Sequence, residues 1–98
     1  MTTTAKLSEA AVEEKLANTT GWSLQNSALT KTFVFADFVQ SLQFVNRLAI
    51  AAEAAQHHPD MDIRYAKVTV TLTTHDSGGI TEKDFALAQE ADAVAERG

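Results

Sequence analysis

Apolar positions recur at helical spacing most clearly in the middle of the chain. We expect this helix to begin after Asp37, because aspartate caps helix N-termini, and to end near Gln56. Pro59 sets that limit, since the residue before a proline avoids the helical conformation. The apolar face of the helix consists of Phe38, Leu42, Val45, Ala49 and Ala52, and Phe44 and Leu48 widen it. A helix with one apolar face is expected to pack against a partner layer.

Capping residues predict two further helices, one near each end of the chain. Ser8 is the expected N-cap of the first, and Thr19-Thr20-Gly21 ends it. Thr81 is the expected N-cap of the last, which follows the flexible turn Ser77-Gly78-Gly79. Asp84, at the third position of that helix, can accept hydrogen bonds from free backbone N–H groups. These positions indicate a structural role for Asp84.

Strands are predicted in two pairs. β-Branched and aromatic residues favour a strand over Leu29–Phe35, and the turn cluster Gln25-Asn26-Ser27 joins it to an extended segment that starts at Trp22. After the central helix, apolar residues alternate first at odd positions (Met61, Ile63 and Tyr65) and then at even positions (Val68, Val70 and Leu72). One strand cannot place both sets on one face, so a turn or bulge is needed near Ala66-Lys67.

The order of elements is therefore helix, two strands, helix, two strands, helix. This order predicts an α+β two-layer sandwich, in which helices cover one face of a four-stranded, mainly antiparallel sheet. A chain of 98 residues is expected to form one domain over residues 1–98. So short a chain buries a modest fraction of its surface, which favours self-association.

Composition and charge exclude several classes of function. The net charge is −5 and the eight Lys and Arg residues are scattered, which argues against direct binding of nucleic acid. There is no cysteine, so disulfides and thiolate metal sites are excluded. The longest apolar-rich stretch, Leu48–Ala55, is too short for a bilayer, and the N-terminus lacks the apolar stretch of a signal peptide. We expect a cytoplasmic protein without membrane contact.

All three histidines, His57, His58 and His75, lie within one third of the chain. Histidine can give or take protons near neutral pH, so the cluster indicates acid–base chemistry. Glu53 and His57 are four residues apart, so on a helix their side chains share a face and can touch. If the turn that carries His75 folds back onto the end of the central helix, three imidazoles and a carboxylate converge.

Simpler interpretations of the same residues stay open at this point. His57 could serve only as a cation at the negative end of a helix, and Glu53 could be a solvated surface residue. Glutamate and three histidines could also hold zinc or iron. However, adjacent histidines on a helix point apart, and the spacing of zinc hydrolases is missing. A nucleophilic triad has even less support, because the chain has no Gly-x-Ser-x-Gly motif and no cysteine. We therefore expect neither a metal nor a cofactor.

Taken as one pattern, the histidine region resembles the pterin-4a-carbinolamine dehydratases. The pattern of that family is an acid, three residues, His-His-Pro, five residues, an aromatic residue, nine residues, a histidine, a spacer and an aspartate. The matching residues are Glu53, His57-His58-Pro59, Tyr65, His75 and Asp84. The resemblance covers about residues 7 to 95 and includes Gly21-Trp22, Phe33–Phe38 and Leu72–Thr81. Ala66 departs from the asparagine that is frequent in the family, which affects local geometry more than chemistry.

The resemblance implies a reaction and a set of roles. The family removes water from a 4a-hydroxytetrahydropterin and forms the quinonoid dihydropterin, in the recycling of the cofactor of aromatic amino acid hydroxylases. His57 and His75 would then be the acid–base groups, and Glu53 would hold His57 in the useful tautomer. The substrate-binding residues would be His58, Pro59 and Trp22. Tyr65 and Asp84 would be structural residues.

The resemblance also implies partners and an alternative function. Members form homodimers and homotetramers by sheet-edge pairing and helix packing, and an aromatic amino acid hydroxylase is a candidate partner. Some relatives act as a cofactor for dimerisation of a homeodomain transcription factor or resemble assembly factors for a carbon-fixing enzyme. Diverged members of the assembly-factor kind are expected to lose the histidines. This chain keeps all of them, which favours catalysis over a role in protein interaction alone.

Overall fold

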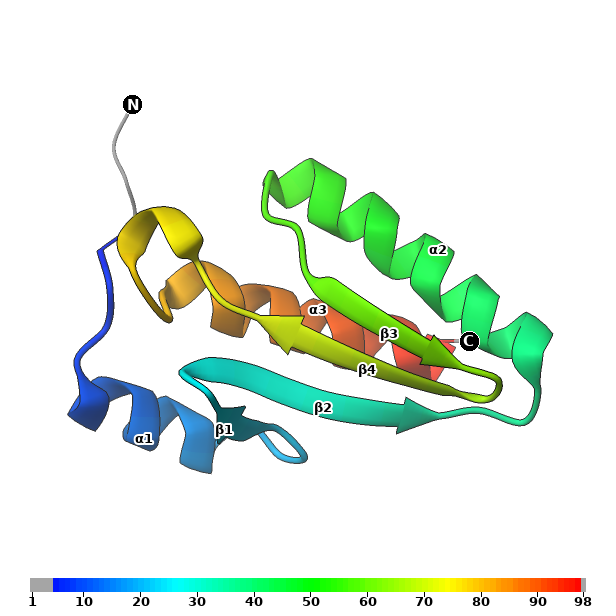
Figure 1. The fold of residues 1–98 in the computed structure, drawn as a ribbon, viewed down its shortest axis with the longest axis horizontal. Coiled ribbons are helices and arrows are strands. Elements are labelled where there is room, and N and C mark those ends of the chain that lie inside the picture. Colours follow the sequence, from blue (N-terminus) through cyan, green and yellow to red (C-terminus); the bar gives the residue numbers. More distant parts are fainter. Residues whose placement is uncertain (1–4, 98) are drawn as a thin grey trace.

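The structure, a computed structural model that describes residues 5–97, consists of a four-stranded sheet with two long helices packed on one face (Figure 1). Its elements in chain order are α1 (Glu9–Ala17), β1 (Ser23–Gln25), β2 (Ala28–Val34), α2 (Phe38–Ala55), β3 (Asp60–Arg64), β4 (Lys67–Leu72), the 3₁₀ helix η1 (His75–Ser77) and α3 (Glu82–Arg97). The predicted α+β class and antiparallel sheet are confirmed. The short η1 helix occupies part of the segment where only a turn was expected.

Local sequence signals account for where the helices begin. The Ser8 hydroxyl accepts a hydrogen bond from the Ala11 N–H at 3.1 Å, and the Asp37 carboxylate accepts one from the Gln40 N–H at 2.9 Å. Both bonds satisfy N–H groups that a helix start leaves without an internal partner. The predicted caps of α1 and α2 are therefore confirmed.

The sheet has the order β1-β2-β4-β3, and every neighbouring pair is antiparallel. Asn26 and Ser27, both with positive φ, connect β1 to β2 in a two-residue hairpin turn. Tyr65 and Ala66 connect β3 to β4, and Tyr65 has a φ of 54°. This second turn resolves the change of phase between the two apolar runs, as predicted.

The core lies between the sheet and the two long helices. The register pairs Leu29 with Leu72 and Phe33 with Val68, so these four side chains face the helices. The helices contribute Phe44, Leu48 and Ala52 from α2 and Phe85, Ala88 and Ala91 from α3. The opposite face of the sheet is polar, and the Thr32 and Thr69 hydroxyls on it form a 2.9 Å hydrogen bond. In the described part of the chain, no helix is both long and apolar enough to cross a bilayer.

The end of α2 changes the direction of the chain abruptly. Gln56 adopts the left-handed conformation, with φ 54° and ψ 38°, directly after the last helical residue. The N–H of Gln56 then bonds to the Glu53 carbonyl at 3.2 Å, and the N–H of His57 bonds to the Ala52 carbonyl at 3.0 Å. These two bonds form a Schellman motif, the usual way to close a helix with a left-handed residue. The motif directs His57 toward the start of α3.

Candidate active site

His57 and Asp84 form a buried pair between the end of α2 and the first turn of α3. The His57 Nε2 atom lies 2.5 Å from the Asp84 Oδ1 atom. The side chain of His57 is 10% exposed and that of Asp84 is fully buried. Such burial and direct contact fix the plane of the imidazole ring.

Two threonines complete the surroundings of the Asp84 carboxylate. Its Oδ2 atom accepts hydrogen bonds from the Thr74 hydroxyl at 2.8 Å and from the Thr81 backbone N–H at 2.9 Å. The Thr74 and Thr81 hydroxyls lie 2.8 Å apart, and both residues are buried. Asp84 therefore has the predicted structural role at the helix start, and in addition it contacts His57, which was not predicted.

His58 and Glu53 form a second pair at the surface. The His58 Nε2 atom lies 2.7 Å from the Glu53 Oε2 atom, with side chains 64% and 72% exposed. The prediction that Glu53 orients His57 is wrong in this structure. That prediction applied helical spacing to Glu53 and His57, but α2 ends at Ala55 and the left-handed Gln56 breaks the helical phase before His57. The next residue, His58, takes the place beside Glu53.

The three histidines line one surface hollow of about 260 Å³. His75 reaches it from the first position of η1 and is exposed. The other lining residues are Gln56, Thr73, Thr74 and Asp76. The turn after β4 thus folds back onto the end of α2, and three imidazoles meet at one place, as the sequence predicted. Glu53 does not line the hollow and is connected to it only through His58.

Other residues with predicted roles lie away from this hollow. Trp22 is buried in the core, 5.9 Å from Phe33 in an edge-on ring contact, and its Nε1–H donates to both carboxylate oxygens of Asp92 at 3.2 and 3.3 Å. Tyr65 is 69% exposed in the β3–β4 turn, at the opposite end of that hairpin from His58. Pro59 follows His58 but is not a lining residue. These positions give no direct support for substrate contacts by Trp22 or Pro59.

Thr74 is a site residue that the sequence did not indicate. It is the residue before His75, and its hydroxyl reaches Asp84, ten residues later in the chain. The residues around it are mostly turn formers, so local patterns give no sign of its contact with a carboxylate. The bridge between Thr74 and Gly79 brings the two ends of the η1 segment together.

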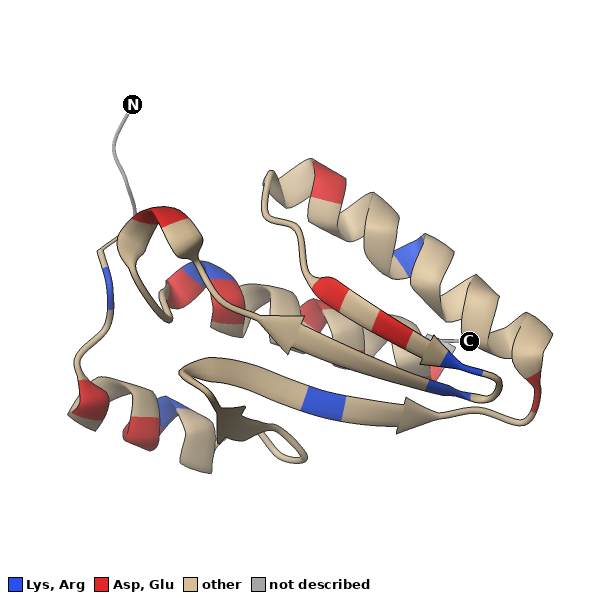
Figure 2. Cartoon of the chain, viewed as in Figure 1, with Lys and Arg blue, Asp and Glu red and all other residues tan. Residues whose placement is uncertain are grey.

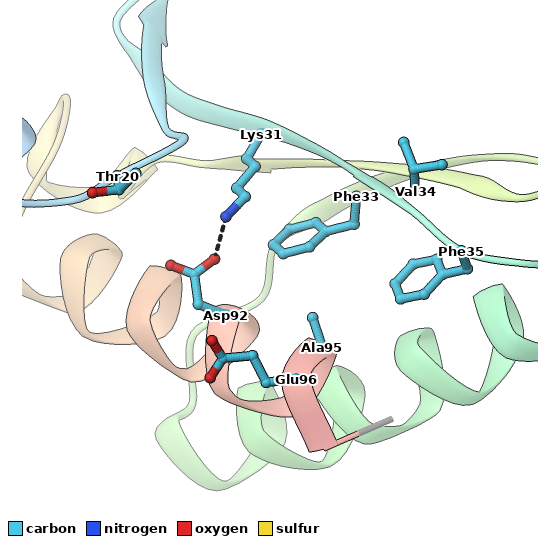
Figure 3. A pocket seen from close by; sticks show the side chains of 8 residues that line it. All are labelled: Thr20, Lys31, Phe33, Val34, Phe35, Asp92, Ala95 and Glu96. Atoms are coloured by element: carbon cyan, nitrogen blue, oxygen red, sulfur yellow. Dashed lines mark hydrogen bonds and ion pairs between the residues drawn. The ribbon is translucent and has the colours of Figure 1, made fainter.

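A larger hollow, of about 430 Å³, lies between β2 and the end of α3 (Figure 3). Its charged residues include Lys31 and Asp92, which form an ion pair at 2.7 Å, and its apolar wall includes Phe33 and Phe35. Figure 3 shows the Lys31 ammonium pointing at the Asp92 carboxylate rather than into open space. No histidine lines this hollow, so its side chains offer no acid–base chemistry like that of the first.

The histidine hollow combines a rigid imidazole with two exposed ones. General acid–base catalysis needs groups that can exchange protons near neutral pH, held within reach of one bound molecule. His57 is held by Asp84, and His75 lines the same hollow. Among the described residues, no group of three His, Cys, Asp or Glu side chains is arranged to hold a metal ion. The arrangement is therefore suited to moving protons on a small bound molecule.

Comparison with protein families gives one match that spans most of the chain. The family model described as Pterin 4 alpha carbinolamine dehydratase matches residues 5–94. A protein of Chloroflexus aurantiacus, provisionally named a pterin-4-alpha-carbinolamine dehydratase, is 53% identical over 89 residues. That alignment covers 91% of this chain and 96% of the relative.

Two solved structures resemble the fold. A transcriptional coactivator/pterin dehydratase from Brucella melitensis superposes with a TM-score of 0.88 and 36% identity, covering 92% of this chain and 98% of the other. A pterin dehydratase-like protein, described as a RuBisCO assembly factor in the alpha-carboxysome, gives a TM-score of 0.66 at 29% identity. This alignment covers 76% of the present chain and 89% of the assembly factor.

Proposed function

This chain belongs to the pterin 4 alpha carbinolamine dehydratase family, and we propose that it removes water from a 4a-hydroxytetrahydropterin to give the quinonoid dihydropterin. The observation that carries this proposal is the meeting of His57, His58 and His75 at one hollow. These are all the histidines of the chain, and they come from two segments separated by the whole β3–β4 hairpin. The biological role that follows is recycling of a tetrahydropterin cofactor.

The dehydration itself needs two proton transfers. The C4a–O bond breaks as an acid protonates the departing hydroxyl, which leaves as water. A base takes the proton of a ring N–H, and the electron pair of that bond forms the new C=N bond. We assign these two transfers to His57 and His75. Each positioned acid or base typically contributes about 10²–10⁴-fold to the rate.

The surface pair has a different role in this proposal. His58 lines the hollow and is largely exposed, so it can contact the pterin and orient it. Glu53 does not line the hollow but contacts His58, so it acts as a positioning residue for His58 rather than as a partner of His57. Pro59 and Trp22 are substrate-binding candidates only through the family resemblance.

A role in protein interaction is the second candidate, because the two similar solved structures are those of a transcriptional coactivator/pterin dehydratase and of a RuBisCO assembly factor. Lys and Arg residues are spread over the elements, and the only neighbouring strand pair among those described is Arg64 with Lys67 at the β3–β4 turn (Figure 2). This distribution argues against direct contact with nucleic acid. A partner of such a module would therefore be a protein. An aromatic amino acid hydroxylase is the partner that the dehydration reaction itself suggests.

We also propose that the protein forms homodimers or homotetramers. Helix α2 exposes four large apolar side chains, those of Phe38, Val39, Leu42 and Ile50. Strand β3 lies at an edge of the sheet. An exposed apolar helix face and an open strand edge both gain stability when a second copy covers them. Light scattering of the purified protein measures the stoichiometry, and a monomer at all concentrations would contradict the proposal.

The central test of the proposed function is steady-state dehydration of a freshly generated 4a-hydroxytetrahydropterin. The wild-type protein should accelerate the reaction well above its rate in buffer. A rate equal to that in buffer would overturn the proposal. A pull-down from the source cells, run in parallel, tests the interaction role. The absence of cysteine suits the reducing cytoplasm, where we expect this reaction to take place.

A further inference from the structure

We infer that Asp84 is a positioning residue that fixes the tautomer of His57, so that His57 exchanges its proton with the substrate through Nδ1. This inference rests on the proposed function of the histidine hollow and specifies the atom that works there. It also adds Thr74 and Thr81 to the machinery, as the residues that orient the Asp84 carboxylate.

The hydrogen bonds around Asp84 are connected in series, and each donates in the direction of the carboxylate. The Lys83 N–H donates to the Thr81 Oγ1 atom at 3.2 Å. Thr74 donates its only hydroxyl proton to Asp84, so in the 2.8 Å contact between the two threonines Thr81 must be the donor. Every proton in this series of hydrogen bonds points toward the Asp84 carboxylate. Such an arrangement fits an ionised carboxylate, which can only accept hydrogen bonds.

The two oxygens of Asp84 are therefore used differently. Oδ2 already accepts two hydrogen bonds, from the Thr74 hydroxyl and the Thr81 N–H. Oδ1 faces His57 Nε2 at 2.5 Å. Because the ionised carboxylate cannot donate, the proton of this contact must sit on Nε2. His57 is thus held either as the neutral Nε2–H tautomer or as the imidazolium.

The remaining ring nitrogen is the one that can react. Within the described residues, no buried side-chain nitrogen or oxygen lacks a hydrogen-bond partner. The side chain of His57 makes its hydrogen bond through Nε2, so Nδ1 without a partner must reach the surface. His57 is a lining residue of the hollow, and we assign the exposed Nδ1 edge of its ring to that lining. Nδ1 offers a lone pair there in the neutral ring and an N–H in the imidazolium.

The test uses nitrogen-15 NMR of the histidine rings in the full-length protein without substrate. The chain has three histidines, so the ring signals can be assigned by single substitutions. We expect the neutral His57 ring of the wild type to be the Nε2–H tautomer. A neutral ring with its proton on Nδ1 in the folded wild type would overturn the inference, without need of any variant.

Asp84→Asn supplies the matching kinetic measurement. An amide that keeps its oxygen toward Thr74 and Thr81 turns its NH₂ toward His57, and that donor forces the ring into the opposite tautomer. We expect kcat to fall about 10²–10⁴-fold while KM changes little, as for loss of one acid–base group. Glu53→Gln is the control, because it makes the same chemical change beside His58 and should leave the His57 signals unmoved.

Thr74→Ser and Thr74→Val form a second pair in case Asp84→Asn does not fold. The serine variant keeps the hydroxyl and should retain the wild-type tautomer and kcat, whereas the valine variant should lower kcat. An equal kcat in both variants would overturn the role of the hydroxyl. If the tautomer is as expected but the wild type does not dehydrate the pterin, the proposed function fails and the positioning of His57 stands. If the wild type dehydrates the pterin but the neutral His57 ring carries its proton on Nδ1, this inference fails and the proposed function stands.

Discussion

Two histidine–carboxylate pairs lie next to each other in this protein and differ in almost everything except their contact distances. His57 and Asp84 are 2.5 Å apart with side chains 10% and 0% exposed, while His58 and Glu53 are 2.7 Å apart with side chains 64% and 72% exposed. We call them the inner pair and the outer pair. The inner pair is fixed by burial and by a threonine network, whereas the outer pair is exposed to solvent. Adjacent residues of one type can thus serve one rigid and one adaptable function.

The backbone at Gln56 creates this difference. Its left-handed conformation ends the helix and sends two consecutive side chains to different environments. In a continuing helix, adjacent residues would be rotated by about 100° and both would stay near the helix surface. The Schellman closure instead directs His57 into the fold and leaves His58 outside.

The largest expected effect concerns catalysis by His57 of the inner pair and by His75, compared with substrate binding by His58 of the outer pair. His57→Ala and His75→Ala should each lower kcat by about 10²–10⁴-fold, because each removes a proton-transfer group. His58→Ala should mainly raise KM, because it removes an orienting contact. Steady-state dehydration kinetics of the three variants measure the contrast. Near-wild-type turnover in both His57→Ala and His75→Ala would show that the assignment of the acid–base groups is wrong.

Stability should separate the two pairs just as clearly. Asp84→Ala leaves His57, the Thr74 hydroxyl and the Thr81 N–H without their buried partner, and we expect a loss of about 3–5 kcal/mol in the free energy of unfolding. Glu53→Ala removes an exposed ion pair and should cost less than about 1 kcal/mol. Urea unfolding of both variants at one pH gives the comparison. Similar losses in the two variants would contradict the distinction between inner and outer pair.

Trp22 tests whether the residues outside the hollow take part in binding. Trp22→Phe keeps the aromatic ring but removes the donor to Asp92, so we expect a loss of about 1.5 kcal/mol in stability. KM should stay at the wild-type value, because Trp22 does not line the histidine hollow. Unfolding and kinetic measurements on one preparation check both points. A large rise in KM with unchanged stability would support the substrate-binding role that the family resemblance implied.

The smallest expected effect is at Gln56, whose left-handed conformation ends α2 before the two histidines. A left-handed conformation costs a residue with a side chain about 1–2 kcal/mol, and glycine avoids this cost but loses more entropy on folding. Gln56→Gly should therefore raise the free energy of unfolding by up to about 1 kcal/mol. Gln56→Ala, which keeps the left-handed strain, is the control and should show no gain. Thermal unfolding is sensitive enough for this comparison, and an equal rise in both variants would contradict the explanation.

The fold could be predicted because its signals are local. Ser8 and Asp37 cap their helices through contacts three residues away, and the change of apolar phase between Tyr65 and Val68 required the turn that the structure contains. The alternation of Val68, Val70 and Leu72 also matches the buried face of β4. Such patterns depend on neighbours in the chain, so a single sequence suffices to interpret them.

The partners within the site were harder to predict because they depend on tertiary contacts. The spacing of Glu53 and His57 suggested an ion pair, but one left-handed residue moved Glu53 to His58. The contact between His57 and Asp84 spans 27 positions, and no local pattern encodes it. Trp22 illustrates the same limit, since its Nε1–H bonds to Asp92 in α3, 70 positions later in the chain.

The most direct test of the account is to follow all three imidazoles while one ligand binds. Titration of the nitrogen-15-labelled protein with a stable 7,8-dihydropterin should move the ring signals of His57, His58 and His75 together, with one shared dissociation constant. That result would place the three rings around one bound heterocycle. A saturable binding curve that leaves the three rings unmoved, or moves only one of them, would contradict the claim that they form a single pterin site.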